Sequence, residues 1–232
     1  SPTITLEHPS YTYTGSAITP TVTSVKDGIN TIPTTEYTVE YSANTDVSST
    51  ATVTITDATN GNYAVSGSVK FEITKSDSTT TPDTNPTETR AYTYGDQITL
   101  TATVGIQEVA PLAALNQVEF FCGETSLGTA EVSNNTATLA YNTTGKKLSI
   151  GENKIKAVYG GSVNLNGSES GEITVTLNAK PLTVGMIGAI ANQTYTGSAI
   201  TPTGLTITDG SRLTEGADYT IQSYASNTNA GT

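Results

Sequence analysis

Histidine and cysteine, two residue types that nucleophilic active sites use, each occur once in this sequence. His8 is the only histidine and Cys122 the only cysteine among 232 residues. A Ser-His-Asp or Cys-His site needs an imidazole beside its nucleophile. His8 stands between Glu7 and Pro9, where we expect the exposed end of a strand, and Cys122 follows two phenylalanines on an alternating segment, which indicates a buried structural thiol. The sequence predicts no catalytic residues and a protein that is not an enzyme.

Metal ligands are also scarce. One histidine and one cysteine cannot complete a tetrahedral zinc shell. Oxygen ligands for calcium stand in Asp57-Ala-Thr-Asn60-Gly-Asn62 and at Asp209-Gly210, without the dense acidic spacing of a dedicated calcium loop. Such side chains also form Asx turns by bonding the nearby backbone. We expect Asx turns and predict no metal-binding residue and no cofactor, with calcium left as an open alternative.

Carboxylates and tyrosines are the residues that could act on sugars. Glycoside hydrolysis needs two carboxylates flanking one bond, whereas the 21 Asp and Glu residues are scattered, most of them at solvent-facing strand positions or turns. Tyrosine rings could stack on sugars, and the chain has twelve of them. We expect one group to pack in the core and another to be partly exposed. The core group is Tyr37, Tyr41, Tyr141 and Tyr159, and the exposed group is Tyr11, Tyr13 and Tyr195.

Charge and hydropathy exclude two kinds of partner. The formal net charge is −11, spread along the chain, and the only adjacent basic pair is Lys146-Lys147. Nucleic-acid binding needs clustered Lys and Arg, so we expect no nucleic-acid partner. No segment approaches the ~20 apolar residues that cross a bilayer, and Ser1-Pro2 begins without a charged and apolar leader. We therefore expect a piece of a longer protein, with no membrane insertion within this fragment.

Strands and turns must position all of these residues. Thr and Ser are abundant, and 21 Gly and 9 Pro interrupt the sequence. Thr and Val favour strands, whereas Gly and Pro break helices. Apolar residues alternate with polar ones in several segments, as an antiparallel sheet with one face in solvent requires. The sequence predicts an all-β protein.

A long motif occurs twice in the chain. Tyr13-Thr-Gly-Ser-Ala-Ile-Thr-Pro-Thr21 recurs letter for letter as Tyr195-Thr-Gly-Ser-Ala-Ile-Thr-Pro-Thr203. Self-similarity of this period marks a tandem array of separately folding units. Arrays typically supply length or multivalency rather than chemistry.

These patterns divide the chain into four parts. We predict a β-sandwich repeat over 1–75, a linker over 76–89, a second sandwich over 90–178 and a partial copy of the first repeat over 181–232. The linker is rich in Ser, Thr and Pro and has no large apolar residue, so we expect an extended spacer that lets the first unit move more freely than the others.

The partial copy stops before counterparts of the strands at 51–55 and 69–73. An incomplete sandwich exposes core residues and unpaired strand edges. We expect this unit to lack native order, to self-associate through its open edge, or to have been cut by the boundary of the fragment.

The motifs resemble two kinds of bacterial domain. Tyr-x-Gly-x-x-x-x-Pro, the Asp-Gly turn and the Asp/Glu-Tyr-Thr strand of the outer units resemble tandem repeats of large Gram-positive surface proteins. Tyr94-Gly-Asp-Gln-Ile-Thr-Leu-Thr-Ala-Thr-Val104, Val118-Glu-Phe-Phe and Ile155-Lys-Ala-Val-Tyr-Gly160 are similar to a bacterial Ig-like domain.

The resemblance implies tandem Ig-like antiparallel β-sandwich modules, the last one truncated, outside the cell at the cell surface or in the cell wall. It implies a non-enzymatic adhesion module or structural stalk whose partner is a host, glycan or cell-surface ligand. The alternative is a carbohydrate-binding accessory region of a secreted or surface enzyme.

Overall fold

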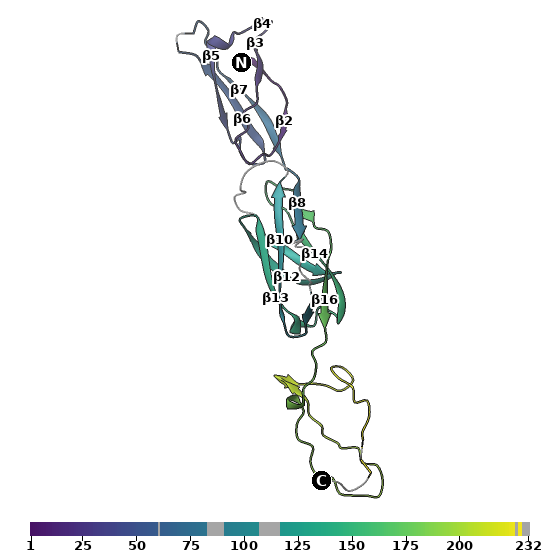
Figure 1. The fold of residues 1–232 in the computed structure, drawn as a ribbon. Coiled ribbons are helices and arrows are strands. Elements are labelled where there is room, and N and C mark those ends of the chain that lie inside the picture. Colours follow the sequence, from purple (N-terminus) through teal and green to yellow (C-terminus); the bar gives the residue numbers. More distant parts are fainter. Residues whose placement is uncertain (60, 83–90, 107–116, 226, 229–232) are drawn as a thin grey trace. The chain divides into compact units, whose positions relative to one another are not determined.

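The structure is a computed structural model that describes residues 1–59, 61–82, 91–106, 117–225 and 227–228 (Figure 1). The chain separates into two units, Ser1–Ala179 and Lys180–Thr232. Helical turns in the described residues are short 3-10 segments, η1 (Thr34–Glu36), η2 (Thr143–Gly145) and η3 (Val184–Met186). None of these helices is long and apolar enough to cross a membrane. The prediction of an all-β protein is confirmed.

The unit Ser1–Ala179 starts with a β-sandwich of two small sheets. One sheet has the order β1-β3-β4 and the other the order β2-β7-β6-β5. All of its strand pairs are antiparallel except β2 with β7. The strands are β1 (Thr3–Leu6), β2 (Ser10–Thr12), β3 (Val22–Asp27), β4 (Asn30–Thr31), β5 (Tyr37–Ser42), β6 (Ser48–Asp57) and β7 (Gly67–Thr74).

Alternation along β6 and β7 builds the core of this first sandwich. Val53, Ile55, Phe71 and Ile73 are buried, while the Thr, Lys and Glu residues between them face outward or are only half-buried. Full burial of each such side chain stabilises the fold by about 1.5–3 kcal/mol. The hairpin β6–β7 is therefore the main source of core side chains in this sandwich.

A second sandwich follows in the same unit. Its sheet order is β8-β10-β13-β12-β11-β14-β16-β9, with β15 paired to β14. The long strand β12 links the two layers, because residues 125–131 pair with β11 and residues 132–133 pair with β13. The strands are β8 (Ser78–Pro82), β9 (Ala91–Thr93), β10 (Gln97–Ile106), β11 (Gln117–Cys122), β12 (Thr125–Ser133), β13 (Thr136–Asn142), β14 (Gly151–Tyr159), β15 (Ser168–Glu169) and β16 (Ile173–Asn178).

The two sandwiches share a topology. The first strand of each pairs antiparallel with a long strand of one sheet, as β1 does with β3 and β8 with β10. The next strand belongs to the opposite sheet and pairs in parallel with the last strand, as β2 does with β7 and β9 with β16. Strand β8 thus corresponds to β1 as the opening strand of its sandwich.

This position of β8 corrects the prediction of a linker over 76–89. Residues 78–82 form a ladder with β10, while residues 83–89 lie outside the described part of the chain. The inward-facing residue of β8 is Thr80, which is 7% exposed, and its hydroxyl lies 2.7 Å from that of Ser168. Ser78 makes a second hydroxyl contact of 2.7 Å with the same serine. Hydrogen bonds take the place of apolar contacts here, so alternation of apolar residues did not reveal the strand.

The two sandwiches are joined directly. The Ser76 amide donates to the Asn164 carbonyl at 3.1 Å, and the Asn166 amide donates to the Ser76 carbonyl at 2.9 Å. Lys75 Nζ donates to the Ser162 carbonyl at 2.7 Å. Apolar side chains of both sandwiches also belong to one continuous buried cluster. These contacts oppose the predicted free movement of the first unit.

The unit Lys180–Thr232 has little regular structure in its described residues. It contains η3, β17 (Thr208–Asp209) and β18 (Ser211–Arg212), with an isolated bridge between Ile187 and Ile207. Ile207, 4% exposed, is its one buried apolar residue in the described range. Large apolar side chains face solvent, as expected of an incomplete sandwich. They are Leu182, Val184, Ile187, Ile190, Tyr195 and Tyr224.

Candidate functional site

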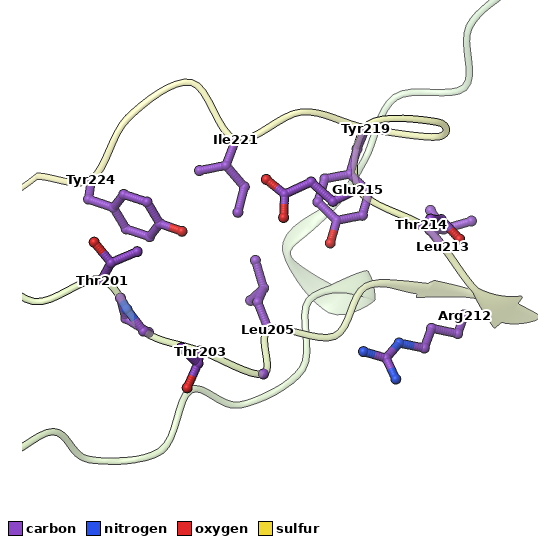
Figure 2. A pocket seen from close by; sticks show the side chains of 12 residues that line it. Thr201, Thr203, Leu205, Arg212, Leu213, Thr214, Glu215, Tyr219, Ile221 and Tyr224 are labelled. Carbon is purple, nitrogen blue, oxygen red and sulfur yellow. The ribbon is translucent and has the colours of Figure 1, made fainter.

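A cavity of about 710 Å³ opens in the unit Lys180–Thr232 (Figure 2). In Figure 2 the Leu205 and Ile221 side chains point toward one another across it, with Glu215 and Tyr224 to either side. Its wall is mainly apolar and hydroxyl-bearing, with one carboxylate and one guanidinium. The lining residues are Thr201, Pro202, Thr203, Gly204, Leu205, Arg212, Leu213, Thr214, Glu215, Tyr219, Ile221 and Tyr224.

The lining residues have counterparts in the first sandwich. The Leu213 amide donates to the Ile207 carbonyl at 2.8 Å, just as the Ile32 amide donates to the Val25 carbonyl at 2.9 Å. The hairpin β17–β18 thus repeats the hairpin β3–β4. Tyr219, in Asp-Tyr-Thr, takes the place of the tyrosine in the Glu-Tyr-Thr of the first repeat. Part of the cavity wall, Leu213 and Tyr219, therefore corresponds to the core positions Ile32 and Tyr37 of the first repeat.

In the first sandwich those positions are covered. Val25, Ile32 and Tyr37 form a buried cluster with Ile55 of β6 and with Val65, two residues before β7. Within the described residues of 180–228, no side chain takes the place of Ile55 or Val65. The cavity is the unfilled half of a sandwich core.

The repeated motif has a structural role that sequence reasoning did not assign. The Ile18 amide donates to the Asn44 carbonyl at 2.8 Å, and Asn44 Nδ2 donates back to the Ile18 carbonyl at 3.0 Å. The same pair of bonds joins Ile200 and Asn227, at 2.8 and 3.1 Å. The motif and its later asparagine therefore form a clamp between two loops.

The tyrosines divide differently from the prediction. Tyr13 is 8% exposed, which corrects its assignment to the partly exposed group, whereas Tyr195 in the same motif is 60% exposed. Tyr11 is half-buried and packs edge-on against Phe71 with ring centroids 5.9 Å apart. Tyr63 is exposed in a loop that sequence reasoning passed over. The four tyrosines of the predicted core group are buried or half-buried: Tyr37, Tyr41, Tyr141 and Tyr159.

His8 lies on the surface, where the sequence predicted it. Its Nε2 atom is 3.9 Å from Glu7 Oε1, and its ring meets the Tyr11 ring edge-on at 5.8 Å. The His8 amide also donates to the Tyr11 hydroxyl at 3.2 Å. These contacts place the histidine against a carboxylate and a phenol at the surface.

Cys122 is half-buried at the end of β11. Burial raises the pKa of its thiol, and the nearby charge of Glu172 raises it further. The thiol points to Asn153, with Sγ 3.8 Å from Oδ1. A raised pKa keeps the sulfur protonated near neutral pH, whereas a nucleophilic cysteine needs the thiolate. This environment suits a structural thiol.

Asn153 is a buried polar residue that sequence reasoning missed. Its Oδ1 accepts from the Ser149 amide at 2.9 Å, and its Nδ2 donates to the carbonyls of Ser149 and Gly151 at 2.8 and 3.0 Å. The side chain holds the turn that leads into β14. An isolated asparagine among polar turn residues carries no sequence signal for such a role.

The candidate calcium ligands take part in contacts within the fold. Asp57 Oδ1 accepts from the Val65 amide, which lies eight residues later in the chain. Asp209 Oδ2 lies 2.6 Å from Lys180 Nζ. Asn60 is outside the described residues. The described residues contain no group of three or more His, Cys, Asp or Glu side chains placed to hold a metal ion.

Comparison with known proteins supports an Ig-like fold. Residues 84–178 match the family model of the bacterial Ig-like domain (group 3). No curated protein matches the chain. With the shared sandwich topology described above, the predicted class of tandem Ig-like antiparallel β-sandwiches is confirmed.

Several solved structures are similar to the chain at low identity. Fibronectin(III)-like modules of Clostridium thermocellum CbhA are 23% identical, over 43% of this chain and 94% of that chain, with a TM-score of 0.30. A 1.5-MDa bacterial ice-binding adhesin is 16% identical, over 57% of this chain and 41% of that chain, with a TM-score of 0.32. Titin domains I67–I69 are 13% identical, over 78% of this chain and 66% of that chain, with a TM-score of 0.34.

Proposed function

We propose that the chain is a non-enzymatic segment of a bacterial surface protein, located outside the cell at the surface or in the wall. Its β-sandwiches act in series as a structural stalk or an adhesion module. The match of residues 84–178 to a bacterial Ig-like domain supports the setting. We propose module bounds of 1–75, 90–178 and 181–232, with β8 added to the second module. The ligand is proposed to be a host, glycan or cell-surface partner.

The joint between the first two sandwiches is the observation that carries this proposal. Asn164 Oδ1 accepts from the Val47 amide at 2.9 Å, and Asn164 Nδ2 donates to Asp46 Oδ1 at 2.8 Å. Together with the bonds of Lys75 and Ser76, these contacts connect residues 46–47 and 75–76 of the first sandwich to residues 162–166 of the second. A projecting stalk needs neighbours that hold their relative orientation, because free hinges shorten its reach.

Stretching single molecules tests the stalk. With the chain tethered at both ends, each sandwich is expected to unfold in one cooperative step. The first module of about 75 residues adds roughly 250 Å of contour length at ~3.4 Å per residue. A chain that extends smoothly, without discrete steps, does not hold its modules under load and contradicts the proposal. Turnover of any substrate by the purified chain contradicts its non-enzymatic part.

A carbohydrate-binding accessory region is the second candidate. The exposed rings of Tyr63, Tyr195 and Tyr224 favour it, because aromatic faces stack on sugars. A glycan array with the chain and its Tyr63→Ala and Tyr195→Ala variants tests it, with the exposed Thr14→Ala as the control. Binding that the tyrosine variants lose and the threonine variant keeps supports this candidate. An array without signal opposes it.

A further inference from the structure

Two asparagines of the second sandwich hold aspartates at the joint with the first sandwich in the same way. Asn164 Nδ2 donates to Asp46 Oδ1 at 2.8 Å, and Asn166 Nδ2 donates to Asp77 Oδ1 at 2.9 Å. The two asparagines differ in the residue that comes next, because Asn164 is followed by leucine and Asn166 by glycine. One loop thus carries a matched pair of carboxamides, of which one has glycine as its neighbour.

The glycine makes Asn166 chemically different from Asn164. The backbone nitrogen of the next residue can attack the Cγ atom of an asparagine within the same chain, and a residue without Cβ leaves that nitrogen least hindered. Asn166 and Gly167 are both exposed, so water reaches the carboxamide. The fold also requires glycine here, since a Cβ on Gly167 would lie 2.8 Å from the Tyr159 carbonyl oxygen. The reactive pair is therefore built into the structure.

We propose that Asn166 is a site of deamidation, and that its conversion weakens the joint between the first two sandwiches. The Gly167 nitrogen loses its proton and bonds to Asn166 Cγ, the Cγ–Nδ2 bond breaks with release of ammonia, and a succinimide forms. Water then opens this ring. Its addition at Cγ gives aspartate, and its addition at the former main-chain carbonyl carbon gives isoaspartate. The reaction consumes one water and no other reagent, and the inference does not depend on the stalk proposal.

Both products change contacts that hold the joint. An aspartate in place of Asn166 has no N–H to donate, and it sets a second carboxylate against that of Asp77, where like charges repel. Isoaspartate also displaces the Asn166 carbonyl, which accepts from the Ser78 hydroxyl at 2.7 Å. It lengthens the main chain before Ser168 by one methylene, and Ser168 is the partner of Ser78 and Thr80 in β8. Conversion therefore loosens β8 together with the joint.

Storage of the purified chain at mildly alkaline pH, followed by peptide mapping with mass spectrometry, tests the chemistry. Asn166 is expected to convert to aspartate and isoaspartate at least about tenfold faster than Asn164, because only its neighbour leaves the attacking nitrogen unhindered. Asn166→Gln is the control, since attack by the same nitrogen must then close a larger ring, and this position is expected to stay unconverted. Equal conversion of Asn164 and Asn166 overturns the inference. So does an intact Asn166 in a sample whose Asn60-Gly61 pair has already converted.

Two substitutions test the effect on the joint. In Asn166→Asp, amide exchange over residues 78–82 is expected to speed up by about threefold, the size of an exposed charge interaction. Combining Asn166→Asp with Asp77→Asn makes the carboxylate and the carboxamide exchange places, so the exchange rate is expected to return to that of the unchanged chain. Exchange over residues 118–122 of β11 shows that the sandwich stays folded. Unchanged exchange in Asn166→Asp, or no recovery in the double variant, refutes the weakening of the joint.

Discussion

Replacing Asn164 by alanine is the sharpest test of the joint between the first two sandwiches. The Asn164 side chain bonds both the Val47 amide and the Asp46 carboxylate of the first sandwich. Among the described residues, Asn164 is the side chain that makes two bonds across this joint to the loop of residues 46–47. Asn164→Ala removes both bonds and leaves the backbone bonds of Ser76 in place.

The size of the effect follows from the two bonds. An ordinary hydrogen bond contributes about 0.5–1.5 kcal/mol, and one to a charged group about 1.5–3 kcal/mol. Asp46 is exposed, so the lower end applies to its bond with Asn164. We expect Asn164→Ala to lower the free energy of unfolding of the first sandwich by about 2 kcal/mol. With a urea m-value of about 2 kcal/mol/M, its midpoint falls by about 1 M.

Hydrogen exchange with mass spectrometry along a urea series measures this effect. Residues 48–57 report on the first sandwich and residues 151–159 on the second. Asn178→Ala is the control, because this exposed asparagine ends β16 and surface substitutions usually change stability by less than about 0.5 kcal/mol. If Asn164→Ala behaves like Asn178→Ala, the joint does not couple the sandwiches and the stalk argument loses its basis.

Three further predictions concern single side chains. Tyr13→Ala is expected to lower the free energy of unfolding by about 3 kcal/mol, because the ring is buried. Tyr195→Ala in the identical motif is expected to lower it by less than about 0.5 kcal/mol. Urea unfolding of both variants measures the difference. Cys122 is expected to react with iodoacetamide more slowly than a free thiol at neutral pH. The pKa of the Cys122 thiol is raised in the folded state. The thiol therefore contributes its full share of stability below the ordinary thiol pKa of ~8.5, and this share falls as pH rises above that value. Urea midpoints from pH 7 to 10 measure the fall. Thr80→Val is expected to destabilise the second sandwich by about 1–2 kcal/mol by leaving the Ser168 hydroxyl without that partner, and combining it with Ser168→Ala recovers part of the loss.

Strands whose cores are apolar could be predicted from the sequence. The alternation at 51–55 and 69–73 gave the positions of β6 and β7 and their buried faces correctly. The strand β8 was missed because its inward positions carry hydroxyls that bond to Ser168. Period-two reasoning detects a strand through apolar burial, so a strand held by polar contacts resembles a spacer. The expectation of an extended spacer was wrong over residues 78–82 for this one reason.

The cavity in the unit Lys180–Thr232 could not be predicted from the sequence for a different reason. Leu213, Tyr219 and Ile221 match inward positions of the first repeat, and nothing in their types marks a cavity. The cavity exists because the side chains that cover the same positions in the first sandwich come from residues 48–74, far along the chain. Local patterns specify which residues face a core, whereas the partner that fills the core is a long-range property.

The two copies of the repeated motif separate these local and long-range contributions. The clamp between the motif and its asparagine forms in both copies, at 2.8 and 3.0 Å for Ile18 with Asn44 and at 2.8 and 3.1 Å for Ile200 with Asn227. The tyrosine that opens the motif is buried in the first copy and exposed in the second. The shared sequence therefore specifies the loop conformation by itself, whereas burial of the tyrosine requires the β6–β7 hairpin.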